Sequence, residues 1–312
     1  MQQSTNLKLK ATRDGLGEGL LELGKTNRQI VVLSADLSES TRANWFKEKY
    51  PNRFIEVGVA EQNMIGVAAG LAQEGFIPFC TSFSAFSPGR NWEQIRVSVC
   101  YNQANVKIVS THAGISVGAD GATHQSTEDI ALMLSLPNMT VISPCDYFEA
   151  LKATIASSKI NGPCYLRFSR LPTPIITAQN DQFEIGKANI IKKGKDVTIF
   201  CHGIMVQESI KAQLQMQKSI DAEIINVHTL KPLDNTTILK SLKKTGRAIV
   251  AEEAIKSGSL FSAISQLVVE NYPCPIQSVA LNSFGESGDP KKLMVKYHIS
   301  SNDIIKAVKK LK

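Results

Sequence analysis

One carboxylate stands at the start of an apolar segment, and its surroundings are typical of a functional site. The carboxylate is Glu61, and small or apolar residues continue after it at helical spacing as far as Gly75. Residues 54–59 before it are mostly apolar and β-branched, which predicts a buried strand. A strand, a sharp turn and a helix present a residue at the carboxyl end of a parallel sheet, where α/β folds place their sites. Glu61 could also be an acidic first-turn residue that only favours the helix dipole.

Further residues able to bind or react follow the other predicted strands in the first half of the chain. Because the carboxyl ends of parallel strands meet at one edge of a sheet, these side chains could share a cleft. Paired aromatic rings suit a planar heteroaromatic ligand, paired histidines suit proton transfer, and arginine suits a phosphate or another anion. The residues are Asp36, Ser40, Phe83, Phe86, His112, Asp120, His124 and Arg170, with Arg13 in the early turns of the first predicted helix.

Simpler interpretations exist for most of these residues. Phe83 and Phe86 are three residues apart and could belong to the core. His112 and His124 could bind a metal, but they lie twelve residues apart across a glycine-rich loop without a cysteine or third histidine, which does not fit zinc. The glycines of that loop match neither a Walker loop nor the dinucleotide fingerprint, and the arginines could be ordinary surface residues. The sequence assigns no role to His202, His228 and His298.

The elements that must position these residues alternate between strands and helices. This alternation predicts an α/β fold with a mostly parallel sheet covered on both faces. Glu61 would open the helix after the 54–59 strand, residues 34–40 would form a polar turn, and the loop at 111–124 would carry both histidines. The expected strands are 30–33, 54–59, 77–79, 106–110, 139–143 and 164–168, and the expected helices are 7–24, 60–75, 92–99, 126–134 and 147–156.

A second, smaller α/β domain is expected after Leu171-Pro-Thr-Pro174 interrupts this pattern. The next residues are polar and rich in turn-forming types, which predicts a linker. We therefore expect a first domain at 1–172, a linker at 173–190 and a second domain at 191–312. The second domain would contain strands at 197–201, 222–227, 248–251 and 277–280 and helices at 207–217, 235–244, 258–270 and 302–311.

The composition is that of a globular protein, with 43% hydrophobic and 20% charged residues. Much of the net charge of +7 comes from lysine runs that no aromatic residues accompany, which is more typical of solvated faces than of a nucleic-acid site. The six cysteines include no Cys-x-x-Cys pair and lie in apolar surroundings, which favours reduced, buried thiols. The sequence contains no apolar leader and no apolar run long enough to span a membrane. We therefore expect a cytoplasmic protein without nucleic-acid or membrane partners.

Several motifs resemble those of the thiamine-diphosphate-dependent transketolases. The resemblance covers nearly the whole chain but only the C-terminal half of a full-length transketolase. It implies a pyrimidine-binding domain followed by the transketolase C-terminal domain. The motifs are Val57-Gly-Val-Ala-Glu-Gln-Asn-Met64, Thr81-Ser-Phe-Ser-Ala-Phe86, His112 with Gly118-Ala-Asp-Gly-Ala-Thr-His-Gln125, Leu136-Pro-Asn-Met-Thr-Val-Ile-Ser-Pro-Cys-Asp146, Ser169-Arg170 and Ser283-Phe-Gly-Glu-Ser287.

The resemblance implies a role for each matching residue. Glu61 would hydrogen-bond N1′ of the aminopyrimidine of thiamine diphosphate and so help to form the nucleophilic C2 carbanion, with the cofactor as electron sink. Phe83 and Phe86 would clamp the pyrimidine ring. Asp120 and His124 would contact substrate hydroxyls, and His124 would also relay protons. The shell around the sugar phosphate would consist of Arg13, Ser40, His112 and Arg170, and Asp36 would be a further contact on the cofactor side.

The resemblance also implies a second chain. The Gly-Asp-Gly motif that carries the metal and the diphosphate in this family is missing from this sequence. The pair Asp120-Gly121 does not supply it, since the surrounding sequence of the motif is absent. A separate N-terminal transketolase subunit would bind the diphosphate through Mg²⁺ or Ca²⁺, and two copies of each chain would form the assembly. This chain alone is expected to be inactive. Ser-Pro-Gly-Arg-Asn follows Phe86 where many transketolases have a tyrosine that extends the aromatic pocket.

These features predict transfer of a two-carbon ketol unit from a ketose phosphate to an aldose phosphate. The sugars stay open, because a terminal sulfonate would satisfy the same guanidinium groups as a phosphate. One alternative is a synthase of the deoxyxylulose-phosphate type, which is normally a single long chain. Another is the β subunit of a 2-oxoacid dehydrogenase, which normally lacks the spacing of His112 and His124. A third is a non-catalytic regulatory paralogue, against which the retention of Glu61 argues.

Overall fold

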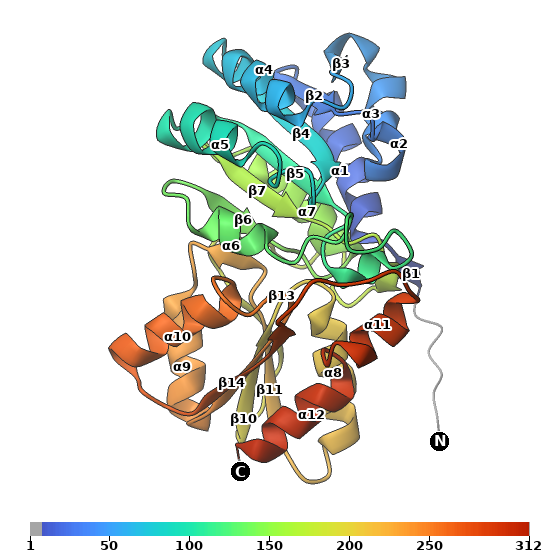
Figure 1. The fold of residues 1–312 in the computed structure, drawn as a ribbon. Helices are drawn as coiled ribbons and strands as arrows, with labels where there is room; N and C mark the ends of the chain where they lie inside the picture. Colours follow the sequence, from blue (N-terminus) through green and yellow to red (C-terminus); the bar gives the residue numbers. More distant parts are fainter. Residues whose placement is uncertain (1–7, 312) are drawn as a thin grey trace.

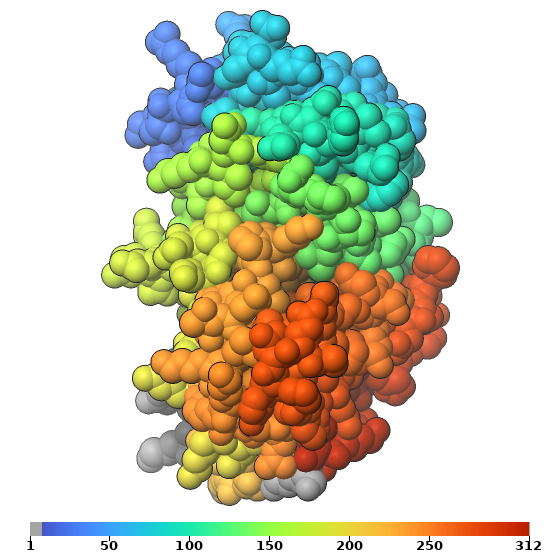
Figure 2. Space-filling model, turned by 90° about the vertical axis from the view of Figure 1, so that its left-hand side faces the viewer, coloured from blue at the N-terminus to red at the C-terminus, as the bar shows by residue number. Residues whose placement is uncertain are grey.

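The computed structural model describes residues 8–311, which form a seven-stranded sheet, a five-stranded sheet and a two-stranded ribbon (Figure 1). In Figure 1 the large sheet, blue to yellow-green over most of its strands, lies above the five-stranded sheet, which runs from yellow to red, and the two halves of the molecule meet along a seam (Figure 2). None of the described helices is long and apolar enough to cross a membrane. The alternation of strands and helices thus gives the α/β fold that the sequence predicted.

The seven-stranded sheet has the order β12-β6-β7-β5-β4-β2-β3. Its strands from β6 to β3 pair in parallel, which confirms the expected mostly parallel sheet, whereas β12 from the second half of the chain pairs antiparallel with β6. The strands are β2 (Ile30–Ser34), β3 (Phe54–Glu56), β4 (Ile77–Phe83), β5 (Lys107–Thr111), β6 (Thr140–Ile142), β7 (Cys164–Arg167) and β12 (Thr229–Lys231).

Helices cover both faces of this sheet. Successive side chains of a strand point to opposite faces, so a strand of consecutive apolar residues needs a helix layer on each side. Val32 packs with one helix layer and Leu33 with the other. Close contact between α1 and α7 requires glycine at position 15, where a Cβ atom would lie 2.2 Å from the carbonyl oxygen of Tyr147. The first layer contains α1 (Thr12–Thr26), α3 (Ala43–Lys49) and α7 (Tyr147–Ser157), and the second contains α4 (Glu61–Gln73), the π-helix η2 (Ile95–Tyr101) and α6 (Asp129–Leu134).

The five-stranded sheet has the order β14-β13-β10-β11-β9, with β9 antiparallel to β11 and the other pairs parallel. Its two faces are covered by α8 with α12 and by α9 with α10. The elements are β9 (Asn189–Lys192), β10 (Val197–Cys201), α8 (Met205–Met216), β11 (Ala222–Asn226), α9 (Asn235–Thr245), β13 (Ala248–Ile255), α10 (Leu260–Asn271), β14 (Ile276–Leu281), α11 (Pro290–Lys296) and α12 (Ser301–Lys310).

The structure corrects several predicted elements. The predicted buried strand 54–59 is the short edge strand β3, in which Phe54 and Ile55 are partly buried and Glu56 is exposed, because one side of an edge strand lacks a neighbour. Residue 7 lies outside the described residues, and α1 begins at Thr12 because β1 (Leu9–Lys10) pairs with β8 (Thr173–Pro174). Within the predicted polar turn 34–40, residue 38 already starts the short helix α2 (Ser38–Thr41).

The cysteines carry free thiols, and five of the six are buried while Cys274 is half-buried. Burial raises the pKa of Cys100 to about 11 and that of Cys201 to about 12. A thiol with a raised pKa is a poor nucleophile and a poor metal ligand, since both roles need the thiolate. The cysteines therefore belong to the core, apart from the half-buried Cys274.

Candidate active site

Glu61 is the first residue of α4, and its side chain is only 2% exposed. One carboxylate oxygen lies 3.1 Å from Nη1 of Arg90, and the other accepts a hydrogen bond of 3.3 Å from the hydroxyl of Ser82. Asn91 donates to the backbone carbonyl of Glu61 at 3.2 Å. The N-terminus of α4 favours a negative charge at this position. The carboxylate is thus held in one orientation at the wall of an open pocket lined by Val59, Ala60, Glu61, Gln62, Asn63 and Arg90.

Four rings form a single cluster beside this pocket. Phe83, at the end of β4, stacks on His112 with ring centroids 3.8 Å apart, and its centroid lies 5.9 Å from that of Phe86. The edge of His124 faces Phe86 at 5.3 Å. The guanidinium of Arg90 lies 4.1 Å above the ring of Phe86, which is a cation–π contact. The predicted aromatic pair and histidine pair are therefore in direct contact.

His112 is held as a neutral imidazole. Its Nε2 lies 3.4 Å from Nη1 of Arg13, and its Nδ1 lies 2.8 Å from the hydroxyl of Thr111. Because a guanidinium can only donate, Nε2 is the acceptor and Nδ1 carries the proton. Burial, and secondarily the charge of Arg13, lowers the pKa of His112 to about 3. His112 can therefore accept or donate a hydrogen bond near pH 7, but it does not act as an acid there.

His124 is only half-buried, and its Nδ1 lies 2.9 Å from the hydroxyl of Thr123. Its ring is therefore more accessible than that of His112, which is buried.

Two arginines form the other end of the site. Nη1 of Arg13 donates to the carbonyl oxygen of Ser40 at 2.9 Å. Nη1 of Arg170 contacts Asp120 at 3.1 Å and the carbonyl oxygen of Val117 at 3.0 Å. Both arginines line one pocket, which is also lined by residues of the glycine-rich loop and by residues 288–290 at the start of α11. Two guanidinium groups at one pocket suit a terminal anion.

Asp36 is set apart from this arrangement. It is exposed, with a φ of 60°, and its backbone N–H donates to Oε1 of Glu56 at 2.7 Å. Among the contacts of residues 8–311, none joins its side chain to the other predicted site residues. The structure therefore brings together all of the predicted residues except Asp36.

Sequence reasoning missed the two residues whose side chains contact the Glu61 carboxylate. Arg90 supplies its ion pair and Ser82 its second hydrogen bond, although both lie close to the predicted aromatic pair. Their positions in the sequence could have indicated both residues, because Ser82 lies next to Phe83 in the same strand and Arg90 lies in the turn after Phe86.

No metal site accompanies these residues. Within the part of the chain that the structure describes, no group of three or more histidine, cysteine, aspartate or glutamate side chains could hold a metal ion. The residues present thus suit the ring of a heteroaromatic ligand and an anion, but they do not suit a metal-bound diphosphate.

The fold and the site are those of α/β proteins that bind a ligand along the carboxyl edge of a parallel sheet. Residues 8–174 match the family described as transketolase, pyrimidine binding domain, and residues 186–304 match the transketolase C-terminal domain. A transketolase C-terminal section from Methanocaldococcus jannaschii is 42% identical over 96% of this chain and 95% of its own length. The 6-deoxy-6-sulfo-D-fructose transketolase subunit SqwH from Clostridium sp. (strain MSTE9) is 40% identical over 98% of this chain and 97% of its own length.

Among solved structures, a split-gene transketolase determined as an inactive tetramer of β subunits is similar to this chain. The TM-score is 0.90 with 41% identity, over 96% of this chain and 98% of that one. This chain belongs to the transketolase family. It corresponds to the C-terminal section, which confirms the resemblance inferred from the motifs.

Proposed function

We propose that this chain is the C-terminal subunit of a two-chain transketolase and that, with an N-terminal subunit, it transfers a two-carbon ketol unit between sugar phosphates. The observation that carries the proposal is the buried Glu61 carboxylate, fixed by Arg90 and Ser82 beside the ring of Phe86. A carboxylate that orients a planar nitrogen heterocycle is what activation of thiamine requires of the protein.

The residues around Glu61 fit the aminopyrimidine end of thiamine diphosphate. When bound, this cofactor supplies an electron sink for the carbanion formed on ketol cleavage. Glu61 would hold a proton at N1′, and Phe83 and Phe86 would pack against the ring. We assign Asp36 to the cofactor side as well.

The remaining residues would act on the sugar. His124 and Asp120 would hydrogen-bond the hydroxyls near the reacting carbons, and His124 would move protons there. At the other end, guanidinium groups would hold the terminal anion, helped by the neutral imidazole of His112. The anion-binding residues are Arg13, Ser40, His112 and Arg170.

The diphosphate end of the cofactor requires a second chain. The described residues contain no acidic cluster that could hold Mg²⁺ or Ca²⁺, so the N-terminal subunit would bind the metal and the diphosphate. We propose a heterotetramer with two copies of each chain, located in the cytoplasm. We also propose the domain boundaries 1–172 and 191–312, joined by the linker 173–190.

Two donor classes fit the arginine pocket. The first is a ketose phosphate of pentose phosphate metabolism. The second is a ketose with a terminal sulfonate, and it is favoured by the similarity to a subunit described as a 6-deoxy-6-sulfo-D-fructose transketolase. Phosphate and sulfonate present the same oxygen acceptors to a guanidinium group.

Reconstitution with both donors tests the proposal. The chain, its N-terminal subunit and their mixture would be supplied with thiamine diphosphate and Mg²⁺. Transfer to an aldose phosphate would then be measured from xylulose 5-phosphate and, separately, from 6-deoxy-6-sulfo-D-fructose. We expect activity only in the mixture, and the donor with the higher kcat/KM identifies the substrate class. A cofactor-loaded mixture inactive on both donors would contradict the proposal.

A further inference from the structure

The glycine-rich loop that carries the site residues is held from behind by the C-terminal half of the molecule. The loop contains the short helix η3 (Ile115–Val117). Glu253, near the end of β13, accepts a hydrogen bond of 2.6 Å from the backbone N–H of Ser116 and one of 3.2 Å from its hydroxyl. Both carboxylate oxygens of Glu253 are thus used on one loop residue.

The contact between this carboxylate and the loop is close. Gly114 has a φ of +79°, and a Cβ atom on it would lie 2.2 Å from the carboxyl carbon of Glu253. Only glycine therefore suits position 114, both for its backbone conformation and for the space available. The loop backbone and the carboxylate fit each other directly.

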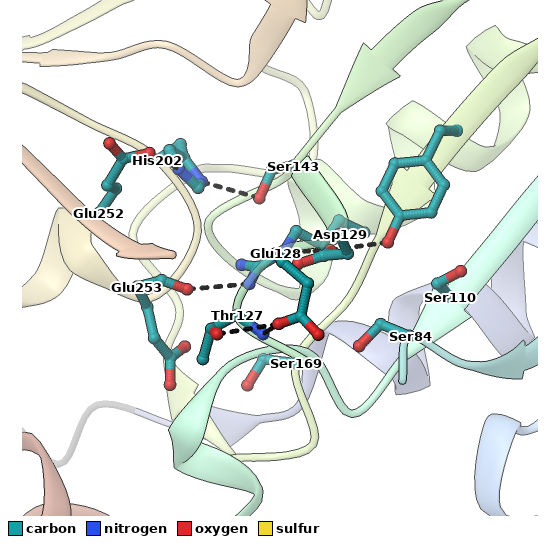
Figure 3. Close-up of polar contacts among 12 residues, drawn as sticks. Ser84, Ser110, Thr127, Glu128, Asp129, Ser143, Ser169, His202, Glu252 and Glu253 are labelled. Carbon is teal, nitrogen blue, oxygen red and sulfur yellow. Dashed lines mark hydrogen bonds and ion pairs between the residues drawn. The ribbon is translucent and has the colours of Figure 1, made fainter. Parts of the chain in front are cut away.

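Glu253 is in turn fixed to the N-terminal half across the seam shown in Figure 3. Its backbone carbonyl accepts a hydrogen bond of 2.9 Å from Arg167, and Arg167 forms a buried ion pair of 2.8 Å with Asp129. The N–H of Ile255 donates to the carbonyl of Thr127 at 2.7 Å. These contacts give the carboxylate a defined position relative to the loop.

Burial raises the pKa of Glu253 to about 7. Ionising a carboxyl group in this buried setting costs free energy. An apolar side chain at the same position would carry no such cost. Glu253 is therefore unfavourable to bury as a carboxylate, and both of its carboxylate oxygens are directed at Ser116.

The next residue of the loop connects Glu253 to the anion pocket. The carbonyl oxygen of Val117 accepts a hydrogen bond of 3.0 Å from Arg170, and Ser116 and Val117 line the same pocket as Arg13 and Arg170. A shift of Ser116 would move this carbonyl and release the guanidinium from its present direction.

We propose that Glu253 is a positioning residue that fixes Ser116 and Val117 so that Arg170 points at the terminal anion of the sugar. This inference rests on the proposed function, because it assigns the arginine pocket to that anion. Glu253 acts through the loop and does not touch the substrate. Its loss should weaken binding of substrates with a terminal anion and leave the Glu61 end unchanged.

The test compares two donors in the reconstituted complex: xylulose 5-phosphate, and L-erythrulose, a short ketose without a terminal anion. For Glu253→Ala we expect KM for xylulose 5-phosphate to rise about tenfold, while kcat/KM for L-erythrulose stays within about twofold. Glu253→Gln should restore most of the difference, because its amide can accept from the Ser116 N–H and donate to the hydroxyl. Ser116→Ala removes only the hydroxyl contact and should raise the same KM about threefold.

Glu223→Ala is the matched control. Glu223 is another buried carboxylate of the five-stranded sheet, but its partners are Ser241 and Lys244 on α9. The control should leave the ratio of the two donors unchanged. If Glu253→Ala and Ser116→Ala affect both donors equally or neither donor, the positioning role is overturned.

A measurement without turnover separates this inference from the proposed function. Binding of inorganic phosphate to the complex can be followed by calorimetry, and we expect Glu253→Ala to weaken it about tenfold while Glu223→Ala does not. If the wild-type complex transfers no ketol unit, the proposed function fails and the phosphate titration still decides the role of Glu253. Equal phosphate affinity of wild type and Glu253→Ala would then overturn the inference.

Discussion

The two ends of the candidate site are built in different ways. The Glu61 end takes its contacts from residues close in sequence, since Ser82, Arg90 and Asn91 all lie within about thirty residues of Glu61. The arginine end depends on distant partners, including Glu253, which lies 137 residues beyond Ser116. The first end is therefore a product of one sheet and its loops, whereas the second needs both halves of the molecule.

This difference predicts which changes separate the two ends. Substitutions near the seam should weaken binding of the terminal anion while turnover at the Glu61 end continues. Damage at Glu61 should abolish turnover with every donor. Comparing donors with and without a terminal anion therefore distinguishes the two ends.

The largest effect is expected from Glu61→Ala. It removes the group that would share a proton with the cofactor and leaves Arg90 without its partner, so kcat should fall by about a thousandfold or more for both donors. Steady-state kinetics of the reconstituted complex measure this loss. Glu74→Ala, an exposed glutamate at the other end of α4, is the control and should have normal activity. Retained turnover in Glu61→Ala would favour a regulatory role for the chain.

Arg170→Ala should have the next largest effect, and only on donors with a terminal anion. Loss of a charge-assisted contact of about 2–3 kcal/mol corresponds to a rise in KM of roughly 30- to 150-fold. The KM values for xylulose 5-phosphate and L-erythrulose should diverge by this factor. Arg28→Ala, on the exposed surface, should change neither value. A uniform loss with both donors would place Arg170 elsewhere in the reaction.

Gly285→Ala should have a smaller effect of the same kind. A Cβ atom at position 285 would lie 1.9 Å from the side-chain oxygen of Gln125, whose amide nitrogen bonds the carbonyls of Ile115, Gly118 and Glu286. Because Gln125 can shift in part, KM for xylulose 5-phosphate should rise about threefold to fivefold. L-Erythrulose kinetics should be unchanged, and an equal change in both donors would contradict the separation of the two ends.

Glu253→Gln should have the smallest effect on activity but a distinct effect on stability. The pKa of Glu253 is raised from 4.5 to about 7 on folding. The stability that this carboxyl group contributes is therefore fully present below pH 4.5 and is lost as the pH rises through 7. Relative to wild type, the variant should gain stability with rising pH, up to about 2–3 kcal/mol at pH 8. Urea denaturation at pH 5 and pH 8 measures this difference. A difference that does not depend on pH would show that burial does not raise this pKa.

The sequence allowed the Glu61 end to be predicted well because its signals are local. An apolar run, a lone carboxylate and a helix-forming segment lie side by side, and α4 does begin at Glu61. Local pattern could not distinguish an edge strand from a central one, so β3 was expected to be more buried than it is. The role of Arg90 was missed because the pattern of a turn does not show where a side chain points.

The arginine end could be predicted only as a set of residues. Nothing near Ser116 indicates that Glu253 contacts it, and the addition of β12 to the first sheet depends on pairing with a strand far away in the chain. The short helix α11 did have a local signal, since Asp289 caps it and Pro290 occupies its first turn. Contacts between the two halves depend on tertiary packing, which sequence periodicity does not encode.

We propose that this chain supplies one part of a transketolase site that an N-terminal subunit completes. The most direct test is to titrate a fixed amount of that subunit with this chain and to measure ketol transfer from xylulose 5-phosphate, or from the sulfonated donor if that one is preferred. The claim predicts no activity from either chain alone and a rate that rises with added chain until the two are equimolar. Activity of this chain alone, or a mixture that binds thiamine diphosphate but stays inactive on both donors, would contradict it.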